Sequence, residues 1–337
     1  MKVYEFREFG IDNLACVERD APRPGPGQVL IRVHASSLNY RDLMTVLGTY
    51  NPRQKLPLVP LSDGAGEVVE VGEGVQSLAV GDRVAGLFAQ AWQAGPFSAA
   101  YRRSTLGGPR DGMLAEYVVL DQSGAVPIPD HLSFEEAATL PCAAVTAWSA
   151  VMEHGEAQPG RTVVLLGTGG VSIFALQFAA LAGARVIVTS SSDEKLARAR
   201  ELGAWETINY RQTPEWQERV KELTDGQGAD HVVEVGGAGT LQRSLTAVGI
   251  GGRVSMIGVV AGAETTLDVR MILMRCVDLQ GIVVGSRRSF EAMNRAIAYH
   301  GLRPVVDTRF GFDRAADAFR HMEAGKHFGK IVLAHAA

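Results

Sequence analysis

A glycine-rich turn is the part of the sequence best suited to hold a charged ligand. The run Gly167-Thr168-Gly169-Gly170-Val171 follows an apolar stretch at 163–166 and precedes an apolar segment of helical length. Glycines let the backbone turn tightly and approach a pyrophosphate, whose charge the amides at a helix N-terminus favour. Ser172 stands where the usual pattern has a third glycine. The turn predicts a dinucleotide site at Gly167, Gly169, Gly170 and Val171; the alternative is a glycine-rich turn without a ligand.

A run of serines indicates which dinucleotide this is. NAD-preferring sites usually place Asp or Glu at the end of the second strand, but here Ser190, Ser191 and Ser192 follow Thr189. Their hydroxyls, with Lys195, can hold a 2′-phosphate, so the sequence predicts NADPH. Two observations weigh against this: Ser191 and Glu194 have capping-box spacing, so the serines can simply cap the next helix, and acidic residues lie at 193–194.

These residues need a parallel sheet to position them, and the pattern from about residue 161 predicts one. Apolar runs of strand length alternate with helical segments. The expected strands are 163–166, 185–189, 206–209, 230–235, 253–258 and 279–285, and the expected helices are 171–182, 193–202, 214–223 and 239–248. Six such strands make a complete doubly wound (Rossmann) α/β fold. The uncharged stretch 163–184 is therefore strand, turn and helix, not a membrane span.

The rest of the chain has a different character. Short apolar runs at 28–35, 64–71 and 115–120 predict a β-rich first domain, and 86–112 reads as a long loop, which in compact domains tends to be functional. The tail holds two helical stretches and a last strand, 330–334, with no parallel partner of its own. We expect domains at 1–122, 123–285 and 286–337, the last returning to the first.

Composition narrows the classes of partner. Hydrophobic residues make up 46% of the 337 residues and charged residues 21%, and the formal charge is −4, so nothing predicts disorder, nucleic-acid binding or an anionic membrane. Three scattered cysteines do not form a disulfide framework and fit a reducing compartment. The first residues alternate like a strand and lack a signal-peptide core, so we expect a cytoplasmic protein that acts on small molecules.

Several short motifs, in order, resemble the medium-chain dehydrogenase/reductase superfamily over nearly the whole chain. They are residues 24–29 (PGPGQV), 38–42 (LNYRD), 64–68 (GAGEV), 80–84 (VGDRV), 139–142 (TLPC), the turn at 167 and 329–333 (GKIVL). The resemblance is nearest to the zinc-free quinone oxidoreductase or enoyl reductase branches. It implies a GroES-like catalytic domain beside the Rossmann domain.

The positions that bind zinc in zinc-dependent relatives are altered here. The resemblance places Asn39 at a cysteine ligand, Ser62-Asp63 at a His-Glu pair, and Cys142 at a third ligand. A catalytic zinc usually needs three nitrogen, sulfur or carboxylate ligands, which one thiol does not provide. Residues 86–112 contain no cysteine for a structural zinc. The sequence predicts no metal, and Cys142 as a small core residue.

Without zinc, hydride transfer to a carbon conjugated to a carbonyl is favoured over alcohol oxidation. The resemblance implies Tyr50 as a proton donor and places Asn39 and Tyr40 near the nicotinamide. The alternative for Tyr50 is a loop packing residue. Asp42 can be structural, with hydrogen bonds to the backbone or to Arg41. We therefore expect an NADPH-dependent reductase of quinones or α,β-unsaturated carbonyl compounds, with a small apolar substrate.

Further cofactor contacts are expected from two sources. The resemblance implies Thr146 near the nicotinamide and Tyr210 near the 2′-phosphate. Carboxyl ends of parallel strands gather ligands, which adds five residues: Ile257, Gly258, Val284, Gly285 and Ser286. Lys330 either reaches a phosphate or flanks an edge strand.

Some alternatives stay open. Trp92, Phe97 and Tyr101 in the long loop either shape a substrate pocket or cover a small core of the loop. Rival functions are a zinc-independent NADP alcohol dehydrogenase and a non-catalytic NADPH-binding sensor or interaction protein. The resemblance implies a homodimer joined near 279–284.

Overall fold

The computed structural model describes residues 1–155 and 157–335, and the chain divides into two compact units. The first unit comprises Met1–Val145 and Gly285–Ala337, and the second Thr146–Val284. The first unit thus extends past residue 122, where the sequence placed a boundary, because Ala125–Pro127 (β7) pairs with Arg83–Gly86 (β5). The other boundary lies at 284/285, next to the predicted one.

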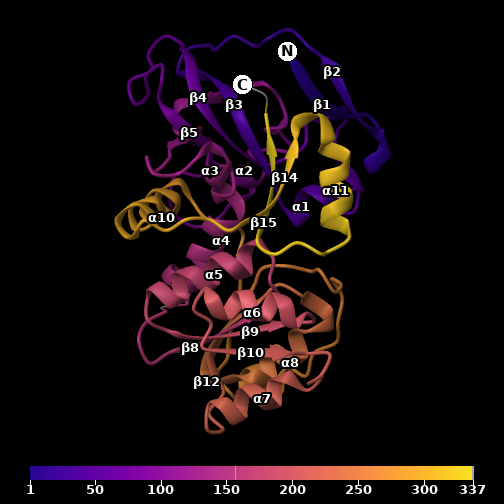
Figure 1. Ribbon diagram of the computed structural model, residues 1–337, viewed down its shortest axis with the longest axis vertical. Coiled ribbons are helices and arrows are strands. Elements are labelled where there is room, and N and C mark those ends of the chain that lie inside the picture. The colour runs from indigo at the N-terminus through magenta and orange to yellow at the C-terminus, as the bar shows by residue number, and fades with distance from the viewer. Residues whose placement is uncertain (156, 336–337) are drawn as a thin grey trace. The chain divides into compact units, whose positions relative to one another are not determined.

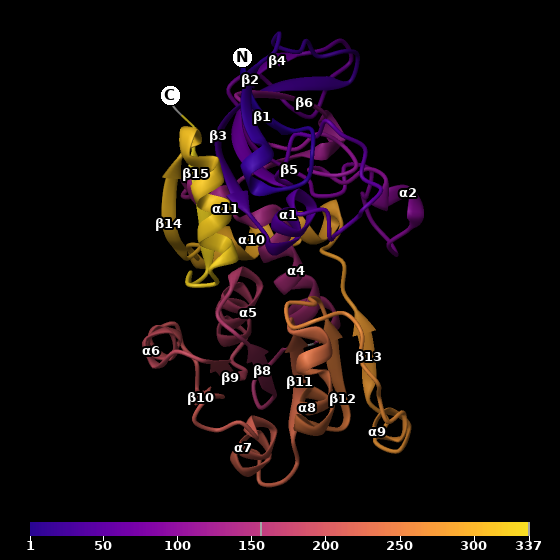
Figure 2. The same ribbon diagram turned by 90° about the vertical axis from the view of Figure 1, so that its right-hand side faces the viewer.

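The second unit is built on a six-stranded parallel sheet in the order β10-β9-β8-β11-β12-β13, which Figure 2 shows from end to end. The strands are β8 (Thr162–Leu166), β9 (Arg185–Ser190), β10 (Glu206–Asn209), β11 (Ala229–Glu234), β12 (Val248–Met256) and β13 (Asp278–Gly281). This confirms the predicted fold class and the count of six strands. All five residues of β8 are buried, as expected of a central strand covered on both faces.

Helices follow the strands as crossovers. They are α5 (Gly170–Leu181), α6 (Asp193–Glu201), α7 (Trp216–Leu223), α8 (Leu241–Ala247) and the short α9 (Arg270–Leu273). Helices α5 and α6 contact β9, whereas α7 packs on α8, which contacts β11 and β12. The uncharged stretch 163–184 is divided between β8 and α5. No helix among the described residues is long and apolar enough to cross a membrane.

The first unit is built on a seven-stranded sheet in the order β14-β15-β3-β4-β5-β7, with β6 also paired to β3. Its strands are β3 (Gln28–Leu38), β4 (Asp63–Val71), β5, β6 (Tyr117–Asp121), β7, β14 (Val306–Gly311) and β15 (Lys330–Ala334), and β1 (Lys2–Phe6) pairs separately with β2 (Leu14–Glu18). The helices are α1 (Tyr40–Val46), α2 (Ala99–Arg102), α3 (Phe134–Ala137), α10 (Arg287–His300) and α11 (Ala315–Glu323).

The last strand, β15, lies inside this sheet, and one expectation about it was wrong. Strand β15 pairs antiparallel with β3 and parallel with β14, so it has the parallel partner that the sequence did not predict. Figure 1 shows β14 and β15, in yellow, beside the indigo β3. The polar sequence of β14, VDTRFG, hides its strand character because an edge strand is only half-buried. The tail does return to the first unit, as expected.

Between Leu140 and His154 the chain forms two π-helical segments, η3 (Leu140–Ala144) and η4 (Ser149–His154), around α4 (Val145–Trp148). The π-helical geometry is uncommon and often occurs at functional sites. Segment η3 is completely buried, with Pro141 in its first turn. The amide of Cys142 in η3 donates to the polar cluster described below.

Candidate functional site

The glycine turn joins β8 to α5 with the geometry that a pyrophosphate needs. Gly167 has φ +71°, a conformation that favours glycine, and the N-cap Gly169 receives no side-chain cap from the described residues. A methyl group at either position would meet no heavy atom within 4 Å. Open space above both glycines and uncapped amides at a twelve-residue helix fit a phosphate-bearing cofactor. Ser172 Oγ donates to Leu166 O at 2.7 Å, so the serine closes the turn where a third glycine is usual.

The serines at the end of β9 have different structural roles. Ser192, not Ser191, is the N-cap of α6: its Oγ accepts from Lys195 N at 3.3 Å. The expected capping box at Ser191 and Glu194 was therefore wrong by one residue. Ser190 is buried, and its Oγ accepts from Ser192 N at 3.3 Å. Ser191 is half-buried and takes no part in the cap.

The nearby acid, Asp193, is held by neighbours. Its two carboxylate oxygens accept from Asn209 Nδ2 at 2.7 Å and Gln212 Nε2 at 2.9 Å. Tyr210 lies between these two residues in the chain and is 41% exposed. The amides occupy the carboxylate from the β10 side, which leaves the serines as the hydroxyl groups at the end of β9.

The remaining predicted cofactor residues lie at strand ends or helix starts. Ile257 and Gly258 directly follow β12, and Ser286 is the N-cap of α10, accepting from Ser289 N at 3.3 Å. Val284 has φ +50°, which is strained for a β-branched residue. Such strain concentrates at functional sites. Thr146 is buried in α4. None of these placements by itself tests cofactor binding, so these residues stay predictions.

In the first unit, a buried polar cluster surrounds the start of α1. Asp42 is completely buried, and its carboxylate accepts from Asn39 N at 2.9 Å and from Ser62 N at 3.2 Å. Asn39 is the N-cap and Asp42 the third residue of the helix, so the two form a capping box. Asp42 thereby ties the start of α1 to the chain just before β4.

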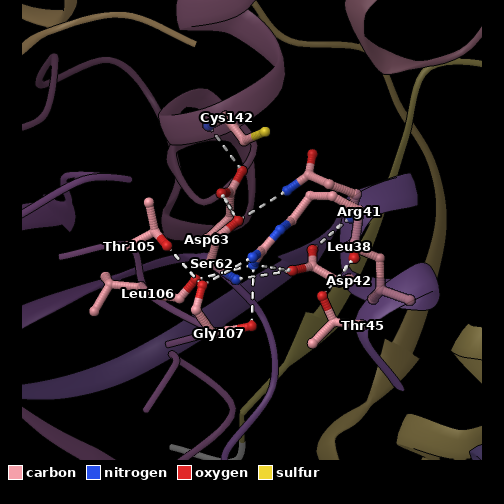
Figure 3. Close-up of polar contacts among 12 residues, drawn as sticks. Leu38, Arg41, Asp42, Thr45, Ser62, Asp63, Thr105, Leu106, Gly107 and Cys142 are labelled. Atoms are coloured by element: carbon pink, nitrogen blue, oxygen red, sulfur yellow. Dashed lines mark hydrogen bonds and ion pairs between the residues drawn. The ribbon is translucent and has the colours of Figure 1, made fainter. Parts of the chain in front are cut away.

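Arg41 connects the same helix to the long loop. Its guanidinium donates to Leu106 O at 2.9 Å, Gly107 O at 3.1 Å and Gly108 O at 3.1 Å, and pairs with Asp42 at 3.1 Å. Figure 3 shows Arg41 and Asp42 together against the carbonyls of Leu106 and Gly107. One buried cation thus fixes the second half of the 86–112 loop.

Asp63, the first residue of β4, is completely buried in the same cluster. Its carboxylate accepts from Ser62 Oγ at 2.7 Å and from Cys142 N at 3.1 Å, as Figure 3 shows. Burial raises the pKa of Asp63 to about 6, and the positive charge of Lys330 opposes this rise. Burial and the neighbouring Asp63 also raise the pKa of the Cys142 thiol far above its usual value. Cys142 is therefore a neutral, inert thiol, in agreement with its expected role as a core residue.

Lys330 closes the cluster from β15. Its side chain is 3% exposed, and Nζ donates to Leu38 O and to Asn39 Oδ1, each at 2.6 Å. Burial lowers the pKa of Lys330, and Asp63 makes the largest opposing contribution. The alternative that Lys330 flanks an edge strand was wrong, because β15 lies between β14 and β3. Contact with a cofactor phosphate stays a prediction for this residue.

The expected catalytic residues differ in burial. Asn39 is 8% exposed, whereas Tyr40 is 41% and Tyr50 is 50% exposed. The ring of Tyr50 lies 5.0 Å from the Arg41 guanidinium carbon, close enough for a cation–π contact. Tyr50 is therefore held by the cluster while its ring stays accessible, and the packing-residue alternative accounts for only part of its surface.

The aromatic residues of the long loop pack on one another. Trp92 lies 5.0 Å from Phe97 and 5.9 Å from Tyr101 between ring centroids, and its Nε1 donates to Gly95 O at 2.8 Å. Trp92 is 8% exposed. These contacts favour a small core of the loop over a lining of a substrate pocket.

Both units of the chain contain residues that match known protein families. Residues 25–130 match the family described as the alcohol dehydrogenase GroES-like domain, and residues 170–298 match the zinc-binding dehydrogenase family. The chain is 46% identical over 331 residues to a zinc-type alcohol dehydrogenase-like protein of Schizosaccharomyces pombe, covering 96% of both chains. The chain belongs to the medium-chain dehydrogenase/reductase superfamily.

More distant relatives carry other names. A quinone oxidoreductase-like protein 2 homolog of Nematostella vectensis is 29% identical, with 92% of this chain and 82% of that one covered. The crystal structure of an NAD-dependent alcohol dehydrogenase is 36% identical, covers 99% of both chains and has a TM-score of 0.91. The chain is thus an oxidoreductase of this superfamily, for which a nicotinamide cofactor is expected. The identity to the zinc-type alcohol dehydrogenase-like relative is higher than the identity to the quinone oxidoreductase-like relative, so the expected nearness to the quinone oxidoreductase branch was wrong.

The residues of the cluster differ from what the zinc in the family's description requires. Among the described residues, no group of three or more His, Cys, Asp or Glu side chains is placed to hold a metal. Cys142 is a neutral thiol, and the Asn39 oxygen already accepts from an ammonium. This donor set does not fit a catalytic zinc.

The sequence identified Asp42 as a structural residue that bonds to the backbone or to Arg41, and the structure confirms this. Sequence reasoning missed two other roles in the cluster: Arg41 as the clamp of the loop, and Lys330 as a buried cation. Arg41 and Asp42 stand together in the LNYRD motif, and a charged pair inside a short apolar helix is a signal of burial with partners. Lys330 begins an apolar strand, which leaves the direction of its side chain open. A buried acid at the end of β11 was also missed: Glu234 Oε1 accepts from Gly236 N at 2.7 Å and Gly237 N at 3.0 Å.

Proposed function

We propose that this protein is an NADPH-dependent reductase of conjugated carbonyl compounds or quinones that works without zinc. The observation that carries the proposal is the cluster at the metal positions of zinc-dependent relatives, where an amide, a neutral thiol and a buried ammonium stand. Without a Lewis acid, stabilisation of an alkoxide loses its usual agent, whereas an enolate needs only hydrogen-bond donors.

The chain supplies such donors in the first unit. A reduced nicotinamide, when bound, would supply a hydride to the carbon β to the carbonyl. The negative charge that then develops on the carbonyl oxygen is stabilised by a donor, and a proton completes the reduction. Tyr50, half-exposed and held over Arg41, is suited to give that proton, and the amide of Asn39 is suited to donate to the oxygen.

The preference for NADPH rests on the end of β9. Three serine hydroxyls stand there, and the neighbouring Asp193 carboxylate is occupied by Asn209 and Gln212. A 2′-phosphate therefore meets hydroxyl groups and Lys195 in place of a free carboxylate. KM for NADPH is expected to be at least about 10-fold below KM for NADH, a difference of about 1.4 kcal/mol. Equal values would contradict the preference but not the reaction.

The test of the reaction uses purified protein with its metal content measured. NADPH is expected to be consumed with conjugated enones and quinones, at a rate that chelators leave unchanged. A zinc-independent alcohol dehydrogenase is the second candidate, because relatives bear alcohol dehydrogenase names. NADP reduction by alcohols with no turnover of any enone or quinone would favour it and overturn the proposal.

Tyr50→Phe tests the assigned proton donor. The variant keeps the ring over Arg41 and removes only the hydroxyl, so kcat is expected to fall about 100-fold while the fold is retained. Tyr299→Phe removes a hydroxyl from an 85% exposed tyrosine of α10 and is the matched control. An unchanged kcat in Tyr50→Phe would remove Tyr50 from the reaction.

A further inference from the structure

A cation is already built into the cluster that replaces the metal site. Lys330 Nζ is buried and donates to two oxygens, Leu38 O and Asn39 Oδ1, at 2.6 Å each. A buried ammonium needs both hydrogen-bond acceptors and an opposite charge. Asp63, completely buried on the neighbouring side of the cluster, provides the largest favourable charge interaction of Lys330.

Lys330 is the cation of the cluster that stands near Asp63, because the other buried cation, Arg41, is paired with Asp42. The titratable groups that face it are Asp63 from β4, Cys142 from η3 and Asp42 from α1. Asp42 is already paired with Arg41 at 3.1 Å, and Cys142 is a neutral thiol. Asp63 therefore depends on Lys330 for charge balance.

The hydrogen bond to Asn39 has a consequence for the amide. Because an ammonium only donates, it fixes Oδ1 of Asn39 toward β15 and leaves the NH2 group on the other side of the amide. That NH2 group hydrogen-bonds the Asp63 carboxylate and lies 3.4 Å from Ser62 Oγ, a long contact. The amide is thereby oriented as a donor.

We propose that the ammonium of Lys330 is an internal cation that takes the place of a metal ion in this site, balancing Asp63 and orienting the Asn39 amide as a hydrogen-bond donor. Lys330 is a positioning residue, since it acts through Asn39. The proposal rests on the zinc-independent part of the proposed function.

The first experiment asks whether the ammonium excludes a metal, and it needs no substrate. Asn39→Cys provides a second thiol beside Asp63 and Cys142, but the ammonium remains. Asn39→Cys combined with Lys330→Met removes the ammonium as well. With Co²⁺ as the probe, thiolate-to-cobalt absorbance is expected for the double variant, with apparent affinity at least about 100-fold above that of Asn39→Cys alone, because Asp63 is then free to pair with the metal.

Equal cobalt binding by the two variants, including none by either, would overturn the proposal. Cobalt binding is measured without any substrate, so its outcome does not depend on the proposed reaction. The proposed function is tested separately, by the zinc content and the activity of the unaltered protein.

The second experiment separates positioning from phosphate binding. Lys330→Met is expected to lower kcat about 10-fold or more while the Kd for NADPH changes less than about 3-fold, and Asn39→Leu is expected to add nothing to that loss. Lys330→Gln keeps a donor without charge and should recover part of kcat. Arg309→Met, which removes an exposed cation from the neighbouring strand β14, is the control. A weakened Kd for NADPH with unchanged kcat would assign Lys330 to the cofactor phosphate and overturn the proposal.

Discussion

Asp42 shows how much one buried side chain organises at the residue scale. It is completely buried, accepts from two backbone amides and pairs with Arg41, whose side chain is 10% exposed. Removing one partner of such a pair leaves the other charge uncompensated, which costs far more than the pair itself contributes.

Asp42→Ala is therefore expected to lower the free energy of unfolding by about 3 kcal/mol or more. Asp12→Ala is the control, because Asp12 is 88% exposed in its pair with Arg320 and should change stability by no more than about 0.5 kcal/mol. Urea unfolding followed by circular dichroism measures both. Similar small losses in the two variants would mean that Arg41 is satisfied by the loop carbonyls alone.

At the scale of elements, a substitution in the turn between β8 and α5 can change cofactor binding without changing the stability of the fold. Gly169 has ordinary backbone angles, φ −79° and ψ −177°, and open space where a methyl group would stand. Alanine there costs the folded protein little. It does place a methyl group where a pyrophosphate needs close approach to the backbone.

Gly169→Ala is expected to keep the midpoint of thermal unfolding and to raise the Kd for NADPH about 10-fold or more, a change of about 1.4 kcal/mol. Gly74→Ala is the converse control: it also has open space but φ +75°, so it should cost about 1 kcal/mol of stability and leave the Kd unchanged. Titration of NADPH fluorescence with each variant decides. Unchanged affinity in Gly169→Ala would place the pyrophosphate elsewhere.

Two buried histidines contribute to the acid response of the whole molecule. Burial lowers the pKa of His231 and of His335 to about 3 each. In the unfolded chain each takes up a proton near pH 6.5, so stability present at neutral pH is lost as the pH falls below that value. Between pH 7 and 5 each histidine removes about 2 kcal/mol. Asp63 acts in the opposite direction, because its raised pKa lets the folded state bind a proton at a higher pH than the unfolded state does. Over the same pH range Asp63 therefore adds about 1 kcal/mol to the free energy of unfolding.

The free energy of unfolding is therefore expected to fall by about 3 kcal/mol from pH 7 to pH 5, measured by urea unfolding in matched buffers. His231→Gln keeps a polar group near Ser255 and should make the fall about 2 kcal/mol smaller. A stability that stays constant over this range would show that the histidines can be solvated when protonated.

Assembly also belongs to this scale. We propose a homodimer through the edge strand β13, because exposed apolar residues gather on nearby α9 and at its two ends: Val269, Leu273 and Met274 are each at least 69% exposed. Light scattering is expected to give twice the mass of the chain, and Leu273→Asp to shift it to the monomer. Tyr299→Asp, at an exposed site on α10, should leave the dimer intact. A monomeric unaltered protein would refute the proposal.

The sequence by itself determined the α/β class, the six parallel strands and the glycine turn, because apolar periodicity and glycine spacing reflect contacts between residues close in the chain. Its resemblance to a known family identified the altered metal positions. The sequence also predicted the return of the tail to the first unit, but not β14, whose half-buried edge position leaves no apolar alternation.

Only the tertiary structure decided what surrounds Asn39. Lys330 is 291 residues away in the chain, and its ammonium reaches Asn39 because β15 pairs with β3 in one register. A shift of one residue would turn Lys330 to the other face of the sheet. The sequence named Asn39 as a residue that cannot bind zinc, and the register of two distant strands placed an ammonium beside it.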